Sequence, residues 1–365
     1  MFFIIGILLA TFLKLLLLIK KNKSRADKIL VIWLFLIALH LGFYYFISTG
    51  AIYNYPHLLG IQFPMPVLQG VLLYFYAMEL TGNKLNKRWA VLLHLLPAAS
   101  LVILAIPFYI LPPNEKVYVF QNDGAGFEWY ILYEEIIIPL SGLLYSVWTL
   151  LLIKKHRLNI RDRFSNTDKK ELQWLKILSI GCIIIWINVI FFDEKIIFTT
   201  VVLLVLFIGF FGINQLNLFY TNQEINIKNV DKETIKIKIE TSNKRYAKSG
   251  LNENKASEIY AKLKGSMEDN SFYKNEELTI AELSKHLEVH PNHLSQVINE
   301  MEGKNFYNYI NSLRIYEFIK LASLPENKKF TIISLAHDCG FSSKSTFNKH
   351  FKLNTGKTPT DFFNS

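Results

Sequence analysis

The stretch "GFSSKSTFNKHFKLNTGKTP", residues 340–359, is polar, carries several lysines and has a turn signal at each end. Phe347 and Phe351 stand four residues apart, so a helix here would bury both rings on one face. Gly340 supplies the positive φ that a tight turn needs, and the serine pair after Phe341 can cap the helix that follows. The opposite face would then display Lys344, Ser345, Asn348, Lys349 and Lys352.

A second copy of this pattern lies upstream. Residues 278–298 are "LTIAELSKHLEVHPNHLSQVI" and residues 330–351 are "FTIISLAHDCGFSSKSTFNKHF". Each has a threonine cap, an apolar helix, a tight turn and a second helix, and Thr279 with the glutamate three residues later has the spacing of a capping box. This repeat predicts two related helix-turn-helix units, at about 278–300 and 330–352.

The second helix of the upstream unit is predicted to begin at Pro291, because proline lacks the N–H that would be unpaired at that position. Helical periodicity puts its apolar residues on one buried face: Leu294, Val297, Ile298 and Met301. The open face keeps the polar residues Asn292, Ser295, Gln296 and Asn299.

The segment between the two units, residues 305–323, is "NFYNYINSLRIYEFIKLAS" and has the pattern of one amphipathic helix. Its candidate packing positions are Phe306, Ile310, Leu313 and Leu321. Roughly 19 residues span about 28 Å, close to the roughly 34 Å between successive major-groove faces of B-DNA. A rigid helix of this length could hold the second helices of the two units, here called the reading helices, in consecutive grooves.

These motifs resemble the DNA-binding domain of the AraC/XylS family of bacterial transcription regulators, over about 256–365. The matching residues of the second unit are Gly340, Phe341, Ser345, Phe347, Phe351, Lys352, Gly356, Thr358 and Pro359. The resemblance implies that the open faces of the two second helices contact bases, and that Arg314 and the C-terminal lysines contact phosphates. The expected partner is double-stranded promoter DNA, with RNA polymerase and a second copy of the chain as further candidates.

Three positions depart from the family pattern. Glu288 stands where the family prefers glycine, His290 where a small hydroxyl is usual, and no arginine follows Pro359. Charge is also uneven, because residues 256–313 hold 5 basic and 9 acidic residues, whereas residues 314–365 hold 8 and 4. We therefore expect the second unit to supply most of the phosphate anchoring.

The rest of the chain is apolar. With 51% hydrophobic residues and a mean hydropathy of +0.22, it contains seven stretches long enough to be membrane spans. They are residues 2–19, 29–47, 59–79, 89–111, 129–153, 174–192 and 196–219. The first is expected to remain as an anchor, because its basic cluster follows the apolar run and no cleavage site is evident. The expected fold is all-α: a seven-helix transmembrane sensor domain over 1–219, a linker over 220–255 and the DNA-binding domain over 256–365.

Loop charges set the expected orientation. The first, third and fifth loops hold 15 Lys and Arg residues, whereas the second, fourth and sixth hold 2. Because short cytoplasmic loops carry the basic excess, the N-terminus is expected outside and the C-terminal domain in the cytoplasm. A multi-pass protein of a bacterial inner membrane follows, since a tethered reader can reach the chromosome only where no nucleus intervenes.

Two carboxylates inside the fifth span, Glu134 and Glu135, are candidates for sensing. They could bind a cationic ligand or share a proton. The alternative, which we favour, is that they lie close enough to the outer interface for water and neighbouring helices to satisfy them. Other polar residues of the spans are expected to bond neighbouring helices: His40, Gln69, His94 and Asn188. The identity of the signal stays unknown.

The remaining features carry less chemistry. The linker contains the alternating segment 234–240, "TIKIKIE", and is expected to be a partly ordered tether that transmits the signal. A turn separates His286 from His290 and His293, so no metal site is expected, and no cofactor or enzymatic activity is expected either. Two other classes stay open: a seven-span receptor or transporter whose tail docks proteins, and an enzyme resting on the carboxylate pair.

Overall fold

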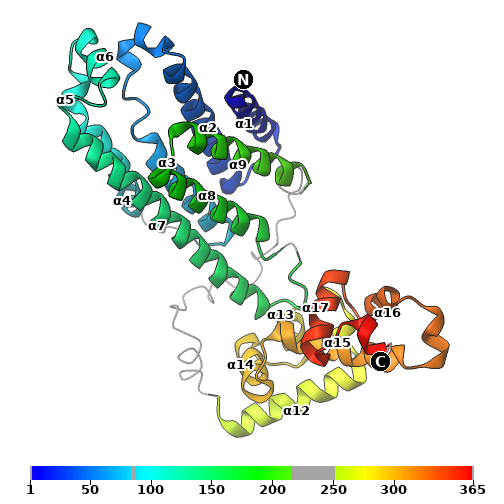
Figure 1. Ribbon diagram of the computed structural model, residues 1–365. Coiled ribbons are helices and arrows are strands. Elements are labelled where there is room, and N and C mark those ends of the chain that lie inside the picture. The colour runs from blue at the N-terminus through cyan, green and yellow to red at the C-terminus, as the bar shows by residue number, and fades with distance from the viewer. Residues whose placement is uncertain (1, 84–87, 169, 215–250, 364–365) are drawn as a thin grey trace. The chain divides into compact units, whose positions relative to one another are not determined.

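The computed structural model describes residues 2–83, 88–168, 170–214 and 251–363 (Figure 1). In this part of the chain the regular structure is helical, apart from one isolated bridge between Phe164 and Thr279. The chain divides into two compact units, Met1–Lys154 with Leu172–Ile227, and Lys155–Glu171 with Lys228–Ser365. The all-α class is confirmed, and a short segment from the apolar half belongs to the C-terminal unit.

The N-terminal unit follows the expected apolar stretches. Its long helices are α1 (Phe2–Ile19), α2 (Arg25–Ser48), α3 (Met65–Leu80), α4 (Arg88–Leu104), α7 (Glu128–Arg161), α8 (Gln173–Phe191) and α9 (Glu194–Asn214). Shorter pieces are η1 (Ala51–Asn54), η2 (Pro56–Leu58), α5 (Ile106–Tyr109) and α6 (Pro113–Gln121). Two expected spans are shorter than predicted, since α3 begins only at Met65 and α4 ends at Leu104.

Proline accounts for both of these boundaries. Pro64 occupies the N-cap of α3 and Pro66 one of its first helical positions, where the missing N–H costs nothing. Pro107 interrupts the fourth apolar stretch, and the short α5 starts one residue before it. Four helices are long and apolar enough to cross a bilayer: Arg25–Ser48, Glu128–Arg161, Gln173–Phe191 and Glu194–Phe211. The other three apolar helices are shorter, so the expected seven spans are supported by length for four.

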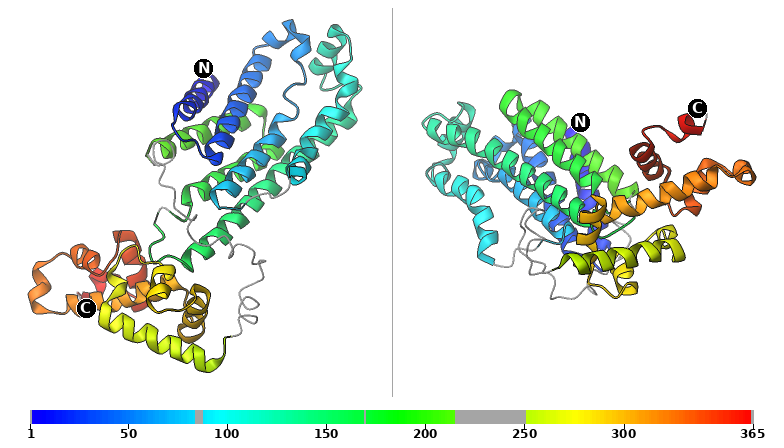
Figure 2. Two further views of the ribbon diagram at one scale, coloured as in Figure 1. Left: turned by 180° about the vertical axis from the view of Figure 1, so that it is seen from behind. Right: turned by 90° about the horizontal axis from the view of Figure 1, so that it is seen from below.

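The helices of this unit contact one another in a ring. α2, α1, α9, α8 and α3 touch in that order, α3 returns to α2, and α4 packs against α3 (Figures 1 and 2). The core between them is apolar, with Leu13, Trp33, Leu34, Leu41 and Leu175 buried.

Polar side chains join these helices as expected. Gln69 accepts a 2.8 Å hydrogen bond from the indole of Trp33, and Asn188 donates to Thr200 over 3.0 Å. His94 Nδ1 lies 2.9 Å from the hydroxyl oxygen of Tyr145. The prediction of helix-to-helix bonds is therefore confirmed for Gln69, His94 and Asn188. The ring of His40 instead packs edge-on against Phe198.

The C-terminal unit contains both expected helix-turn-helix units. Its elements are α12 (Glu253–Asn270), η5 (Phe272–Lys274), α13 (Ile280–His286), α14 (Pro291–Glu302), α15 (Phe306–Ala322), η6 (Pro325–Lys329), α16 (Ile332–Asp338), α17 (Lys344–Thr355) and α18 (Pro359–Phe363). The connecting helix α15 is confirmed. α12 begins inside the segment assigned to the linker, and residues 220–250 of that segment, including the alternation at 234–240, lie outside the described residues.

Each helix-turn-helix unit has its own apolar core at one end of α15. Around the first, Leu294 and Phe306 are buried together with Leu263 of α12. Around the second, Phe318 contacts Phe347, with ring centroids 4.7 Å apart. Because the two cores are separate, α15 is the common element on which both units are built.

The two turns differ in their backbone chemistry. Glu288 has φ +55° and Gly340 has φ +92°, so both turns use the left-handed region. A Cβ on Gly340 would lie 2.7 Å from the carbonyl oxygen of Lys274 and 2.9 Å from that of Tyr273, which makes glycine necessary there. The glutamate in the first turn costs on the order of 1 kcal/mol.

Candidate nucleic-acid interface and acidic cavity

The second reading helix, α17, presents its basic face to solvent. Ser343 caps it by accepting a hydrogen bond from the backbone N–H of Thr346, and Phe347 and Phe351 are buried. The sequence-predicted contact residues are all exposed: Lys344, Ser345, Asn348, Lys349 and Lys352. Four of them line an open groove of about 900 Å³ that Ile332 and Ile333 of α16 border. This face can offer cations to phosphates and an amide and hydroxyl to base edges.

The first reading helix, α14, is less accessible than predicted. Asn292 is exposed, and Ser295 and Asn299 are half-buried. Gln296 is only 5% exposed, and its Nε2 donates to Glu300 over 2.8 Å. Its assignment to the open face is therefore wrong in this structure. Met301, predicted to be buried, is 43% exposed instead.

Arg314 does not lie where a phosphate contact requires it. Its side chain is 1% exposed, its Nε donates to the carbonyl of Tyr273 over 2.6 Å, and Nη2 donates to that of Asn275 over 2.8 Å. Burial lowers the pKa of Arg314 to about 10, so the guanidinium stays charged at neutral pH. The predicted phosphate contact is wrong here, since the guanidinium donates its hydrogen bonds to the segment before α13 and so ties that segment to α15.

The segment between α7 and α8, residues 162–171, belongs to this same unit. Ser165 donates its N–H to the carbonyl of Leu278 over 3.0 Å, and the Arg163 carbonyl accepts from the N–H of Ile280 over 2.9 Å. Ser165 is fully buried, and its carbonyl accepts from Nδ2 of Asn311 over 3.0 Å. From its sequence, this segment was expected to be only a basic loop. One local feature of the sequence indicated that the segment is buried and hydrogen-bonded. This was its run of small polar residues, Ser165, Asn166 and Thr167.

The same segment also reaches the second unit. The carboxylate of Asp168 accepts hydrogen bonds from the hydroxyls of Ser342 at 3.0 Å, Ser343 at 2.7 Å and Thr346 at 2.9 Å. These three hydroxyls stand at the N-terminus of α17. An acidic side chain therefore sits at the start of the candidate reading helix.

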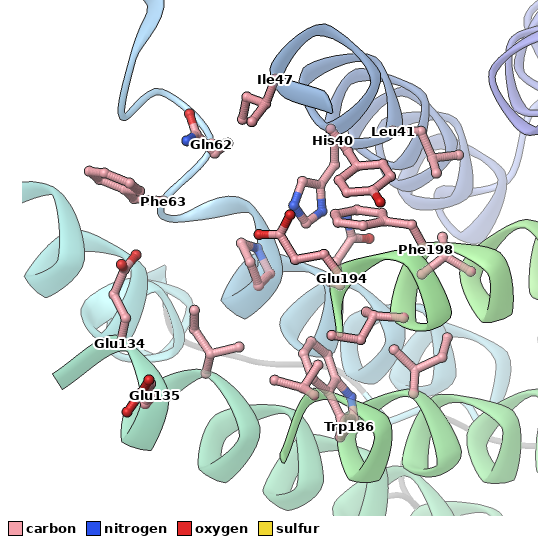
Figure 3. Close-up of a pocket in the computed structure, with 18 of the residues that line it drawn as sticks. His40, Leu41, Ile47, Gln62, Phe63, Glu134, Glu135, Trp186, Glu194 and Phe198 are labelled. Carbon is pink, nitrogen blue, oxygen red and sulfur yellow. The ribbon is translucent and has the colours of Figure 1, made fainter. Parts of the chain in front are cut away.

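The N-terminal unit contains a cavity of about 830 Å³ (Figure 3). Its wall includes Glu134 and Glu135, which the sequence singled out, and also Asp123 and Glu194, which it did not. None of the described residues that line it is lysine or arginine, and the remaining wall is mostly apolar and aromatic. A Cβ on Gly142 of α7 would clash with the ring of Trp186, which lines the cavity, so α7 and α8 approach each other closely at this point. The arrangement suits a ligand with a cationic group and an apolar body.

The histidines that could have suggested a metal have other contacts. His290 Nδ1 accepts a hydrogen bond from the N–H of Asn292 over 3.2 Å, which caps α14 in place of the usual hydroxyl. His286 packs on Phe272, with ring centroids 4.6 Å apart. In the described part of the chain, these side chains therefore act in capping and packing.

Comparisons with known proteins bear on the C-terminal unit. Residues 283–365 match the family model described as "Helix-turn-helix domain". An uncharacterized HTH-type transcriptional regulator of Staphylococcus aureus (strain COL) is 34% identical over 88 residues, which cover 24% of this chain and 11% of that relative. The chain thus spans about a tenth of that relative's length. No solved structure matches. The C-terminal unit therefore carries a helix-turn-helix domain.

Proposed function

We propose that this chain is a membrane-embedded, sequence-specific DNA-binding transcription regulator that couples a signal at the bacterial cell membrane to gene expression. The observation that carries the proposal is the exposed lysine face of α17 within a helix-turn-helix domain. Charged groups on a helix of this motif are placed to meet the phosphate backbone while neighbouring polar groups reach the major groove.

The two reading helices would make different contacts with promoter DNA. α17 offers Lys344, Lys349 and Lys352 for phosphates, with Ser345 and Asn348 for base edges. α14 offers the polar residues Asn292, Ser295 and Asn299, and its sequence contains no lysine or arginine. We infer that binding strength comes mainly from α17 and that α14 adds discrimination between sequences.

The apolar half supports placement in a bilayer. Of the most apolar window in each long helix, only 28–39% is buried inside the unit. On α7 the exposed apolar side chains recur every four residues, at Leu132, Ile136, Leu140 and Leu144. Such a stripe would be costly in water and is favourable against lipid tails. We propose a seven-span arrangement with the N-terminus outside, on the strength of 15 Lys and Arg residues in odd loops against 2 in even loops.

The acidic cavity is the proposed sensing site. A ligand can shift the equilibrium between two arrangements of the helices only by its differential affinity for them. A cationic ligand that draws Glu134, Glu135 and Glu194 together would favour one arrangement. The proposed partners are promoter DNA, membrane lipid, a second copy of the chain and RNA polymerase.

The test is selection of DNA by the full chain in lipid nanodiscs. The protein is mixed with fragmented genomic DNA at moderate salt, and bound fragments are sequenced. The proposal expects enrichment of a shared sequence, and loss of that enrichment in Lys344→Ala/Lys349→Ala. Binding without sequence preference would favour a protein-docking tail. A reporter fused after Ser365 should report the cytoplasm, and a periplasmic signal would overturn the topology.

A further inference from the structure

We propose that the N-terminus of α17 is an anion-binding site for which the carboxylate of Asp168 and a backbone phosphate of DNA compete. The proposal rests on the proposed function, because it names a phosphate contact of the same reading helix. In this proposal the segment between α7 and α8 covers part of the surface that would contact DNA.

The site is built from three hydroxyl donors. Ser342 and Ser343 donate to Oδ2 of Asp168, and Thr346 donates to Oδ1, so both carboxylate oxygens are held. Ser343 is the N-cap of α17, a helix long enough for its N-terminus to attract anions through its unpaired N–H groups and dipole. An anion is thus seated at this helix end, on donors of the kind that also bind phosphate oxygens.

The position of the site makes a DNA phosphate the competing ligand. Lys344 and Ser345, both exposed, follow the capping serine directly, and Asn348 lies one turn further on the open face. In helix-turn-helix domains the first residues of the second helix enter the major groove, and helix N-termini are common phosphate contacts. A carboxylate held at this end would repel the phosphate that the exposed face needs to approach.

The rest of the segment is anchored to the first unit. Asn166 Nδ2 and Lys170 Nζ each donate to the carboxylate of Glu277 over 2.8 Å. Together with the bridge at Phe164 and Thr279, these bonds hold the segment beside α13. The segment is therefore attached to the region of α13, and from there the side chain of Asp168 reaches the N-terminus of α17.

This segment is continuous in sequence with the helices of the N-terminal unit. α7 runs without a break from Glu128 to Arg161, directly before the segment, and α8 begins at Gln173, directly after it. A change in the separation of these two helices would pull on both ends of the segment. We infer a second route for the signal, distinct from the linker at 220–255 that was expected to transmit it.

The experiment uses Asp168→Asn in the full chain in nanodiscs, with DNA affinity measured by fluorescence anisotropy on the selected sequence. Loss of the competing charge should lower Kd about tenfold and steepen the salt dependence by about one phosphate contact. The matched control is Glu253→Gln, which removes the same charge from the exposed first turn of α12 and should leave Kd within about twofold. Unchanged or weaker binding by Asp168→Asn would overturn the proposal.

A second variant guards against a folding effect. Thr346→Val removes one donor, so in the Asp168→Asn background it should weaken DNA binding several-fold if phosphate uses the vacated site. Thermal unfolding of each variant checks that the helix-turn-helix domain is intact. Failure of the parent protein to bind any DNA sequence would reject the proposed function itself. A parent that binds while the Asp168→Asn and Thr346→Val changes leave Kd unaltered would reject this inference alone.

Discussion

The two helix-turn-helix units share a backbone pattern and differ in what they present to solvent. α14 has no lysine or arginine, buries Gln296 and is reached through a turn with a strained Glu288. α17 displays three lysines, follows a glycine turn and has Asp168 at its N-terminus. The core positions set the fold of both, whereas a handful of outward positions distinguish the roles that we propose for them on DNA. We propose that the second unit anchors the protein on DNA, and that Asp168 of the same chain blocks part of its DNA-facing surface.

Arg314→Met should have the largest effect, because Arg314 ties the segment before α13 to the helix that both units share. Removing its guanidinium leaves buried carbonyls without donors, each worth about 1–3 kcal/mol, so the free energy of unfolding should fall by about 3–4 kcal/mol. Hydrogen exchange of α15 amides in the full chain measures this fall. Lys320→Met, on the exposed side of α15, is the control and should change it by about 0.5 kcal/mol or less. A stable Arg314→Met protein with a reduced salt slope would restore the phosphate role.

Gly340→Ala tests the glycine turn of the second unit. The added Cβ would meet two backbone carbonyls within 3 Å at a positive φ, so we expect a loss of about 2–3 kcal/mol. Gly303→Ala is matched to it, since Gly303 has φ +64° and nothing within 4 Å of the added carbon. That control should cost about 1 kcal/mol. Equal losses for both changes, in thermal unfolding, would refute the close approach.

Acid should weaken the second unit through His350 on α17. Burial, helped by the charges of Lys349, Arg314 and Arg161, lowers the pKa of His350 to about 4. The unfolded chain binds this proton near pH 6.5, so stability is present above that pH and falls as pH drops towards 4. Between pH 7 and 5 the loss should be about 2 kcal/mol. His350→Gln should flatten this part of the stability profile, and an unaltered profile would show that another group titrates.

Glu288→Gly gives the smallest expected effect and brings the first turn closer to the second. A glycine at φ +55° removes strain, so the free energy of unfolding should rise by about 0.5–1 kcal/mol. The measurement is the midpoint of thermal unfolding, with Glu282→Gly in α13 as a destabilising comparison because it removes the capping box. A lower midpoint for Glu288→Gly would show that its side chain contributes more than the strain costs.

Local patterns in the sequence predicted the parts of the fold that local chemistry determines. Thr279 with Glu282 forms the capping box, Thr331 caps α16, and α15 spans the segment expected of it. Periodicity failed for Gln296, which it placed on the open face, and the family resemblance failed for Arg314, whose burial depends on distant partners. Arg314 bonds carbonyls about 40 residues earlier and Ser165, 149 residues away. No pattern within one helix contains that information.

The apolar half shows the same limit. Hydropathy located every long helix, but prolines, and not hydropathy, decided where α3 begins and α4 ends. Glu134 and Glu135 were identified as single residues, whereas the cavity that joins them to Asp123 and Glu194 arises from segments far apart in the chain. The docking of residues 162–171 onto the helix-turn-helix units was equally invisible, because the loop's basic charge predicted only its side of the membrane.

The most direct test of the central claim is the salt dependence of DNA binding by the full chain in nanodiscs. Lys344→Ala, Lys349→Ala and Lys352→Ala should each weaken binding and reduce the slope of log affinity against log salt by roughly 0.9. Asn292→Ala on α14 should leave the slope unchanged and relax the sequence preference. Slopes that stay equal in the lysine variants and the parent would contradict the assignment of α17 as the DNA anchor.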